Sequence, residues 1–141
     1  LQILSQLYKD EDRISISDSA YADMRQISQK SDRINIVLDL IYHSAYNELN
    51  LEHCASTMNM SKTYFCRWFK KMTGHTFTTY RDKVLIERFC QELISSDKNI
   101  SNLAFDMGFE SVFHFNRTFK KVKGISPTQY KKDFQNNLNM K

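Results

Sequence analysis

Residues 100–130 read ISNLAFDMGFESVFHFNRTFKKVKGISPTQY, and this stretch decides the fold. Its apolar residues recur at three- and four-residue steps from Ile100 to Met107, which is the spacing of a helix with one buried face. Gly108 predicts the end of that helix, because glycine enters the left-handed conformation without steric cost. A second helix, rich in Lys and Arg, begins near Ser111. Together these features are typical of a helix-turn-helix DNA-binding unit, and a helical hairpin with a solvated basic face is the alternative.

The same pattern occurs once more, fifty positions earlier in the chain. Seven residues of the first copy, Phe65, Arg67, Phe69, Lys70, Lys71, Gly74 and Tyr80, return as Phe115, Arg117, Phe119, Lys120, Lys121, Gly124 and Tyr130. Upstream the offset is forty-nine, so residues 51–60 correspond to residues 100–109 and the second turn holds one additional residue. Such self-similarity indicates a duplicated structural unit. Two basic helix-turn-helix units in one short chain indicate DNA binding.

Composition favours an all-helical chain. One proline and three glycines among 141 residues leave little material for a β-rich fold with tight turns. Residues 1–50 carry five Lys or Arg against eight Asp or Glu, whereas residues 51–141 carry fifteen against eight. The positive charge therefore lies on the duplicated part, as a phosphate-facing surface requires. The sequence has no run of about 18 apolar residues, so we expect a cytoplasmic protein without a membrane span.

The cysteines and histidines do not indicate a catalytic or metal site. Cys54, Cys66 and Cys90 are odd in number and lack C-x-x-C spacing, so neither disulfides nor zinc are favoured. The four histidines form no i, i+4 pair. No nucleophile, acid–base pair or cofactor motif converges, so we expect neither an enzyme nor a bound cofactor.

The segment from Gly108 to Tyr130 has the pattern G-F-x-S-x-x-x-F-x-R-x-F-K-K-x-x-G-x-S-P-x-x-Y, which resembles the AraC/XylS family of transcription regulators. The resemblance covers residues 33–132. It implies a bacterial regulator whose two readers occupy successive major-groove turns of double-stranded DNA, with RNA polymerase as a further partner. It also implies that an effector ligand binds only through a separate N-terminal sensory domain.

The expected fold class is all-α, with two helix-turn-helix subdomains joined by a long central helix and preceded by a short helical linker segment. We expect residues 1–30 to be a linker or the last helices of a sensory domain, residues 31–134 the double helix-turn-helix domain, and residues 135–141 a polar tail. The chain opens at Leu1 in the middle of an amphipathic helical pattern, which favours a fragment of a longer protein. We expect that fragment to be monomeric, with any dimer of the full-length protein formed through its first thirty residues.

Capping residues predict the helix boundaries. Asn50, Ser61 and Ser126 are the expected N-caps of three helices in the duplicated part, and a support helix is expected to begin near Ser31 or Asp32. The central helix is predicted over residues 78–95. Within it, Leu85 and Phe89 stand where members of the resembled family usually carry arginine and alanine, so we expect repacking between the two units.

The exposed faces of the second helix in each unit supply the candidate DNA contacts. The aromatic residues at three- and four-residue steps are expected to be buried in the core, so the remaining positions of each helix face outward. The candidates for base contact are Thr63, Cys66, Arg67, Val112, Phe113, His114, Asn116 and Arg117. The candidates for phosphate contact are Lys62, Lys70, Lys71, Lys120 and Lys121. Arginine can donate two hydrogen bonds to guanine O6 and N7, or it can bind a phosphate group of the backbone. The resemblance favours base contact for Arg67 and leaves both roles open for Arg117.

The two readers are not equivalent. Val112 and Phe113 cannot hydrogen-bond to bases, so we expect the second half-site to be more degenerate than the half read by Thr63 and Arg67. A protein-interaction module that keeps the fold but acts on another regulator or on RNA polymerase is the alternative function. Both arginines and both Lys-Lys pairs favour DNA binding over this alternative.

Overall fold

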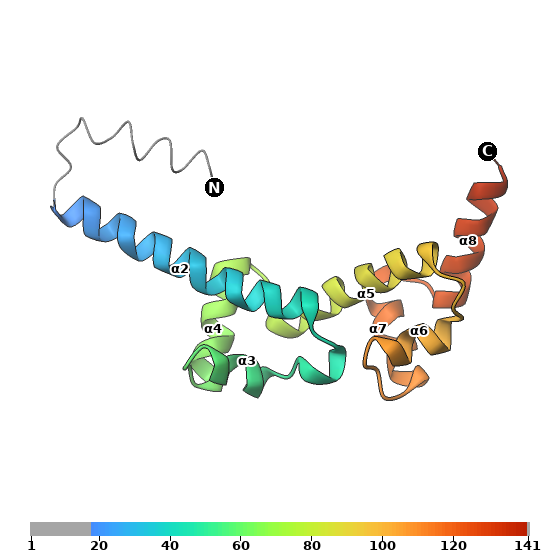
Figure 1. Cartoon of the computed structure of the whole chain (residues 1–141), viewed down its shortest axis with the longest axis horizontal. Helices are drawn as coiled ribbons and strands as arrows, with labels where there is room; N and C mark the ends of the chain where they lie inside the picture. The colour runs from blue at the N-terminus through green and yellow to red at the C-terminus, as the bar shows by residue number, and fades with distance from the viewer. Residues whose placement is uncertain (1–17, 141) are drawn as a thin grey trace. The chain divides into compact units, whose positions relative to one another are not determined.

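The computed structural model describes the backbone of residues 18–140 and the side chains of residues 29 and 31–140. Its elements, all helical, are α2 (Asp18–His43), η1 (Tyr46–Glu48), α3 (Leu51–Thr57), α4 (Lys62–Thr73), α5 (Phe77–Ser95), α6 (Ile100–Asp106), α7 (Val112–Lys123) and α8 (Pro127–Asn139) (Figure 1). The predicted all-α class is confirmed. The apolar pattern expected to begin at Leu1 lies outside the described residues. No helix within them is long and apolar enough to cross a membrane.

α2 is one continuous helix from Asp18 to His43, where the sequence predicted two helices with a new start near Ser31 or Asp32. That prediction was wrong for a local reason. The stretch contains no proline or glycine, and both residues lie exposed in the helix interior instead of capping a start. The chain divides into two compact parts after Asn35, and both helix-turn-helix units lie in the second part.

The C-terminal end of α2 is anchored to α5. Ile41 is fully buried, and Arg88 of α5 donates from Nη1 to the carbonyls of Ile41 (3.3 Å) and Ser44 (2.9 Å). A guanidinium at this place satisfies carbonyls that the helix end leaves free and complements the helix dipole. Tyr42, the next residue, is half exposed because it lies about 100° further round the helix than Ile41.

The first helix-turn-helix unit consists of α3 and α4, with α5 packed against α4. Both predicted N-caps are confirmed: the side chains of Asn50 and Ser61 accept hydrogen bonds from the backbone amides three residues on, at 2.6 and 3.2 Å. Phe65 and Phe69 of α4 are fully buried. Phe77 of α5 meets both rings edge-on at centroid distances of 5.6 Å, so an aromatic cluster holds α4 against α5.

The second helix-turn-helix unit, α6 and α7, packs against α5, and α8 packs against α7. The rings of Phe115 and Phe119 lie 5.9 Å apart, the same centroid distance as in the matching pair of the first unit. Pro127 stands where the first unit has Phe77. Phe89 of α5, fully buried, supplies the third ring, 4.5 Å from Phe115 and 5.8 Å from Phe119. The aromatic side chain at position 89 is therefore accommodated inside the second core.

The turns of the two units have the same hydrogen-bonding pattern. Gly108 (φ 95°) takes the left-handed conformation, as the sequence predicted, and Asn59 (φ 54°) takes it at the matching place of the first unit. In the first unit the amide of Met60 donates to the carbonyl of Ala55 at 2.9 Å. In the second unit the amide of Phe109 donates to the carbonyl of Ala104 at 3.1 Å. This is the Schellman arrangement of a helix end. Four residues connect α3 to α4 and five connect α6 to α7, which confirms the additional residue in the second turn.

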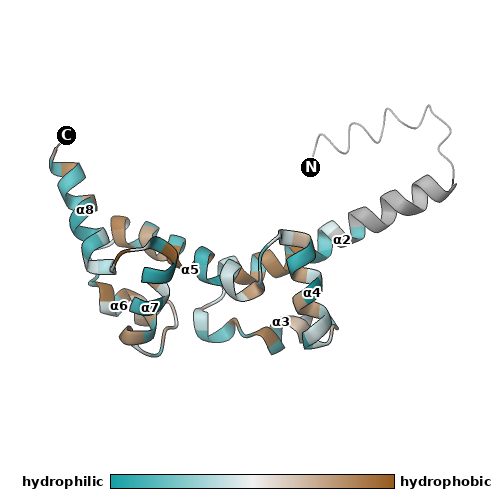
Figure 2. Ribbon diagram, turned by 180° about the vertical axis from the view of Figure 1, so that it is seen from behind, coloured by the Kyte–Doolittle hydropathy of each residue, from teal (hydrophilic) through white to brown (hydrophobic). Residues whose placement is uncertain are grey.

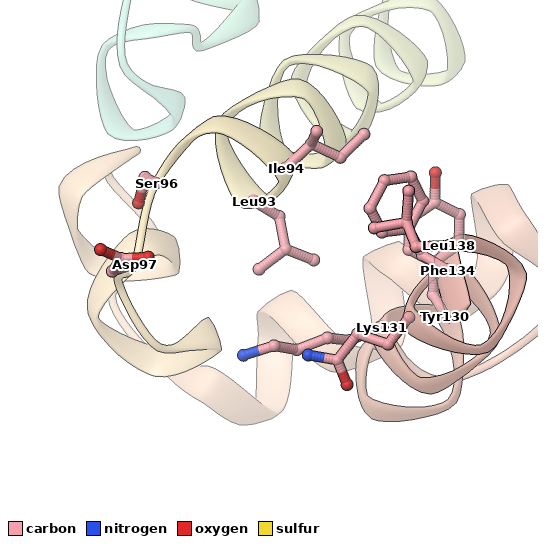
Figure 3. A pocket seen from close by; sticks show the side chains of 9 residues that line it. Leu93, Ile94, Ser96, Asp97, Tyr130, Lys131, Phe134 and Leu138 are labelled. Atoms are coloured by element: carbon pink, nitrogen blue, oxygen red, sulfur yellow. The ribbon is translucent and has the colours of Figure 1, made fainter. Parts of the chain in front are cut away.

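α8 continues to Asn139, through most of the stretch 135–141 that the sequence predicted as a polar tail. Tyr130, Phe134 and Leu138 recur every fourth residue, so the apolar face of α8 extends further than the prediction allowed. These residues line a hollow together with Leu93, Ile94, Ser96, Asp97, Lys131 and Gln135 (Figure 3). The rest of α8 is mostly hydrophilic (Figure 2). The predicted start at Ser126 is confirmed, since its side chain accepts from the amide of Gln129 at 3.1 Å.

The three cysteines differ in accessibility, and we expect them to differ in reactivity. Cys54 and Cys90 are buried, and burial raises the pKa of both thiols, whereas Cys66 is exposed on α4. Since the thiolate is the reactive form, only Cys66 should react rapidly with Ellman's reagent in the native protein. The other two should react after unfolding in guanidinium chloride. Rapid reaction of more than one thiol in the folded protein would contradict this assignment.

Candidate nucleic-acid interface

α4 buries one face and presents the other to solvent. The predicted contact residues Thr63, Cys66, Arg67 and Lys70 are all exposed. Ser61 caps the beginning of the helix and Gly74, at φ 79°, ends it, so the exposed face is held at both ends. Tyr64 is 55% exposed and lies three residues before Arg67, on the same side of the helix. The sequence did not predict Tyr64 as a DNA contact, although it too lies outside the positions that are buried in the core.

α7 repeats this exposed face with different chemistry. Phe113 is 72% exposed, which is unusual for an aromatic residue in a packed domain. The guanidinium carbon of Arg117 lies 5.9 Å from the centre of its ring, within the range of a cation–π interaction. Asn116 is exposed, whereas Val112 is partly buried at the start of the helix. Phe113 and Arg117 therefore form one surface, with Val112 at its edge.

The predicted phosphate-binding lysines lie at the surface. Lys70, Lys71, Lys120 and Lys121 are exposed in the last turns of α4 and α7. Lys62, at the start of α4, lies 3.6 Å from the carboxylate of Glu52, and both side chains are well exposed. Such a surface pair contributes about 0–1 kcal/mol, so it does not hold Lys62 away from another anion.

Lys123, also in the last turn of α7, has a different environment. Its ammonium is paired with Glu87 of α5, and this hydrogen bond raises the pKa of Lys123 although partial burial opposes the shift. The Lys123 side chain is 23% exposed. Lys123 therefore joins α7 to α5, while Lys120 and Lys121 remain at the surface of the same helix.

His114, predicted as a base contact, is engaged within the protein. Its Nε2 lies 2.7 Å from the hydroxyl of Tyr46, which precedes α3 in the first unit. Arg81 of α5 donates from Nη2 to the same hydroxyl at 3.3 Å. Tyr46 and Arg81 were missed from the sequence, because a contact between residues 68 positions apart leaves no periodic signal.

Known proteins match the chain over the two helix-turn-helix units. A family model described as a helix-turn-helix domain matches residues 54–133. The MmsAB operon regulatory protein of Pseudomonas aeruginosa is 36% identical over 83 residues, which cover 59% of this chain and 27% of that protein. The multiple antibiotic resistance protein MarA of Escherichia coli is 34% identical over 98 residues, which cover 70% of this chain and 77% of MarA. The chain spans about a third of the length of the first four curated relatives, between 27% and 35%.

Solved structures share the same architecture. The C-terminal domain of AraT, a response regulator from Geobacillus stearothermophilus, has a TM-score of 0.65 and 28% identity, and the match covers 72% of this chain and 84% of that domain. The DNA-binding domain of AdpA in complex with a target DNA has a TM-score of 0.64. Its identity is 20%, and the match covers 77% of this chain and 94% of that domain, so this likeness shows the fold alone.

Proposed function

The chain belongs to the AraC/XylS family of helix-turn-helix transcription regulators, and on that basis we propose that it binds double-stranded DNA in a sequence-specific manner. The observation that carries the proposal is the duplication of one basic unit. In each copy an exposed arginine, Arg67 or Arg117, lies at the matching position of the second helix. The opposite face of that helix carries two fully buried phenylalanines. Two such helices suit successive turns of the major groove, about 34–36 Å apart.

The contact roles follow the chemistry of the exposed side chains. We assign base contact to Thr63, Cys66, Arg67, Phe113, Asn116 and Arg117, and phosphate contact to Lys62, Lys70, Lys71, Lys120 and Lys121. Val112 is assigned to the edge of the interface, because it is partly buried. Arg67 is the principal reader, since a bidentate arginine–guanine pair contributes about 1–3 kcal/mol of discrimination. Arg117 lies against the Phe113 ring, which suits contact with a thymine methyl beside it.

Other partners are proposed for the regulator as a whole. Contact with RNA polymerase, effector binding through a sensory domain and dimerisation in the full-length protein are expectations from the family. We assign none of the described residues to polymerase contact, effector binding or dimerisation. A protein-interaction module without DNA binding is the competing function, and retention on heparin with a steep salt dependence separates the two.

Substitution of Arg67 and of Lys120 should affect DNA binding differently. The cognate site is first obtained by selecting bound sequences from a random double-stranded library. Arg67→Ala should weaken binding to that site by about 5- to 150-fold, the equivalent of one bidentate pair, with little change on random DNA. Lys120→Ala should weaken both alike and reduce the slope of log affinity against log salt by about 0.9. Fluorescence anisotropy at several salt concentrations measures both quantities.

The matched control is Lys132→Ala, an exposed lysine on α8 outside the proposed interface, which should leave the affinity and the salt slope unchanged. Equal losses on cognate and random DNA for Arg67→Ala would show that Arg67 does not read a base. Absence of any saturable, salt-dependent binding to the library would contradict the proposed function itself. The selected motif should be sharper in the half read by α4 than in the half read by α7.

A further inference from the structure

The segment between α2 and α3 (residues 44–50) leads into the first helix-turn-helix unit but contacts the turn of the second. The backbone amide of Tyr46 donates to the carbonyl of Met107 at 2.8 Å. The Tyr46 ring stacks on Phe109, with centroids 4.2 Å apart and 17° between the planes. Met107 and Phe109 both lie between α6 and α7. The two units are therefore joined by a second connection in addition to α5.

The Tyr46 hydroxyl extends this connection to α7 and α5. Arg81 of α5 donates from Nη2 to the hydroxyl oxygen at 3.3 Å, and Nε2 of His114 lies 2.7 Å from the same oxygen. Arginine only donates, so the Tyr46 oxygen accepts the bond from Arg81, and the Tyr46 hydroxyl shares a second hydrogen bond with His114 Nε2. Burial raises the pKa of Tyr46, so its hydroxyl stays protonated at neutral pH.

Arg81 holds the segment at its other side. Its guanidinium lies over the Tyr46 ring at 4.6 Å and donates from Nη1 to the carbonyl of Leu49 at 3.1 Å. The Arg81 side chain, 15% exposed, pairs with the 9% exposed side chain of Asp82 at 3.1 Å. A buried ion pair with further hydrogen bonds is costly to disrupt, because removing one partner leaves a buried charge. α5 and the segment are thus fixed to each other at the point where Tyr46 meets the second unit.

Gly108 allows the close approach. A Cβ at this position would lie 2.8 Å from the backbone nitrogen of Tyr46 and 2.9 Å from the Cβ of Ala45. The corresponding position of the first turn, Asn59, carries a side chain. The second turn is therefore shaped to receive the 44–50 segment.

We propose that Tyr46 is a positioning residue that locks the two helix-turn-helix units at one separation and orientation, and that His114 is its partner on α7 instead of a base reader. The proposal deepens the proposed function, since it concerns how two readers are held to one DNA site. A single helix such as α5 bends and twists, whereas two connections at different places restrict both motions. The lock therefore determines how strictly the protein requires one spacing between half-sites.

The first test measures the lock without DNA. Spin labels are attached to Cys66 on α4 and to a cysteine introduced by Lys132→Cys on α8, because Cys54 and Cys90 are buried. Pulsed electron–electron resonance then gives the distribution of distances between the two units. Tyr46→Ala should broaden this distribution about twofold, and Tyr46→Phe, which keeps the stacked ring, should broaden it less. Tyr42→Ala, which removes an exposed tyrosine four residues earlier, should leave it unchanged.

The second test uses the selected DNA site with one base pair inserted or removed between its halves, which rotates one half by about 35°. The wild-type protein should lose about tenfold or more in affinity, and Tyr46→Ala should lose less. His114→Ala should relax the spacing requirement in the same way without changing the base preferred at any position. A changed base preference would identify His114 as a reader and overturn its assigned role.

An unchanged distance distribution in Tyr46→Ala would overturn the lock, because α5 alone would then set the orientation. This result does not depend on DNA binding. Failure of the chain to bind the library would instead contradict the proposed function, while the distance measurement would still decide the lock. Broader distances together with relaxed spacing would support both.

Discussion

Phe89→Ala is expected to destabilise the second helix-turn-helix unit by about 3–5 kcal/mol, the usual cost of truncating a buried phenylalanine. Phe89 is fully buried and its ring contacts Phe115 and Phe119 at centroid distances of 4.5 and 5.8 Å. Truncation removes both aromatic contacts and leaves a cavity between α5 and α7. Since domains of this size are stable by only about 5–15 kcal/mol, the loss is a large part of the total.

Urea denaturation followed by circular dichroism measures this change. Trp68, the only tryptophan, lies in α4, so its fluorescence reports the first unit separately. The dichroism midpoint of Phe89→Ala should fall by more than the fluorescence midpoint. Phe105→Ala is the matched control, because Phe105 is 51% exposed on α6 and its loss should change stability by less than about 0.5 kcal/mol. Equal effects of the two substitutions would show that Phe89 is not a packed core residue.

Gly108→Ala is expected to destabilise the protein through two separate costs. A left-handed alanine costs about 1–2 kcal/mol. The new Cβ would also meet Asn47 Oδ1 at 2.6 Å and Tyr46 N at 2.8 Å. The Asn47 side chain can rotate away, but the Tyr46 amide is already bonded to the carbonyl of Met107. Forcing the segment outward adds about 1–3 kcal/mol, the usual cost of overpacking.

Gly124→Ala separates the two costs. Gly124 has a similar φ, 81° against 95°, but a Cβ there would have no neighbour within 4 Å. It should therefore show the conformational cost alone, of about 1–2 kcal/mol. The difference between the two variants in urea denaturation measures the contact between the 44–50 segment and the second turn. Equal destabilisation would show that this segment moves aside freely and makes no firm contact.

The repeat carried most of the fold prediction. An aromatic pair at four-residue spacing, a capping serine or asparagine and a left-handed turn residue each act within a few positions of one another, so their order in the sequence is sufficient to place α3, α4, α6 and α7. The exposed faces of α4 and α7 could also be predicted, because they consist of the positions that are not assigned to the core. Arg67, Arg117 and the four paired lysines are exposed as a consequence.

The predictions that were wrong concern where a helix stops. Ser31 and Asp32 are good capping residues, yet α2 continues through them because nothing in that stretch interrupts its hydrogen bonds. The polar residues after Phe134 suggested a tail, yet Leu138 extends the apolar face of α8.

The sequence by itself determined the helix-turn-helix duplication, the helix caps and the exposed basic faces, because each depends on residues that are neighbours along the chain. Only the tertiary structure decided that Phe89 fills the second core and that His114 faces Tyr46. Tyr46 and His114 lie 68 positions apart, and no repeat or spacing links them. They meet because α5 sets the separation of the units and Gly108 leaves space for the approaching backbone. A contact of this kind depends on how whole elements pack, which local patterns do not encode.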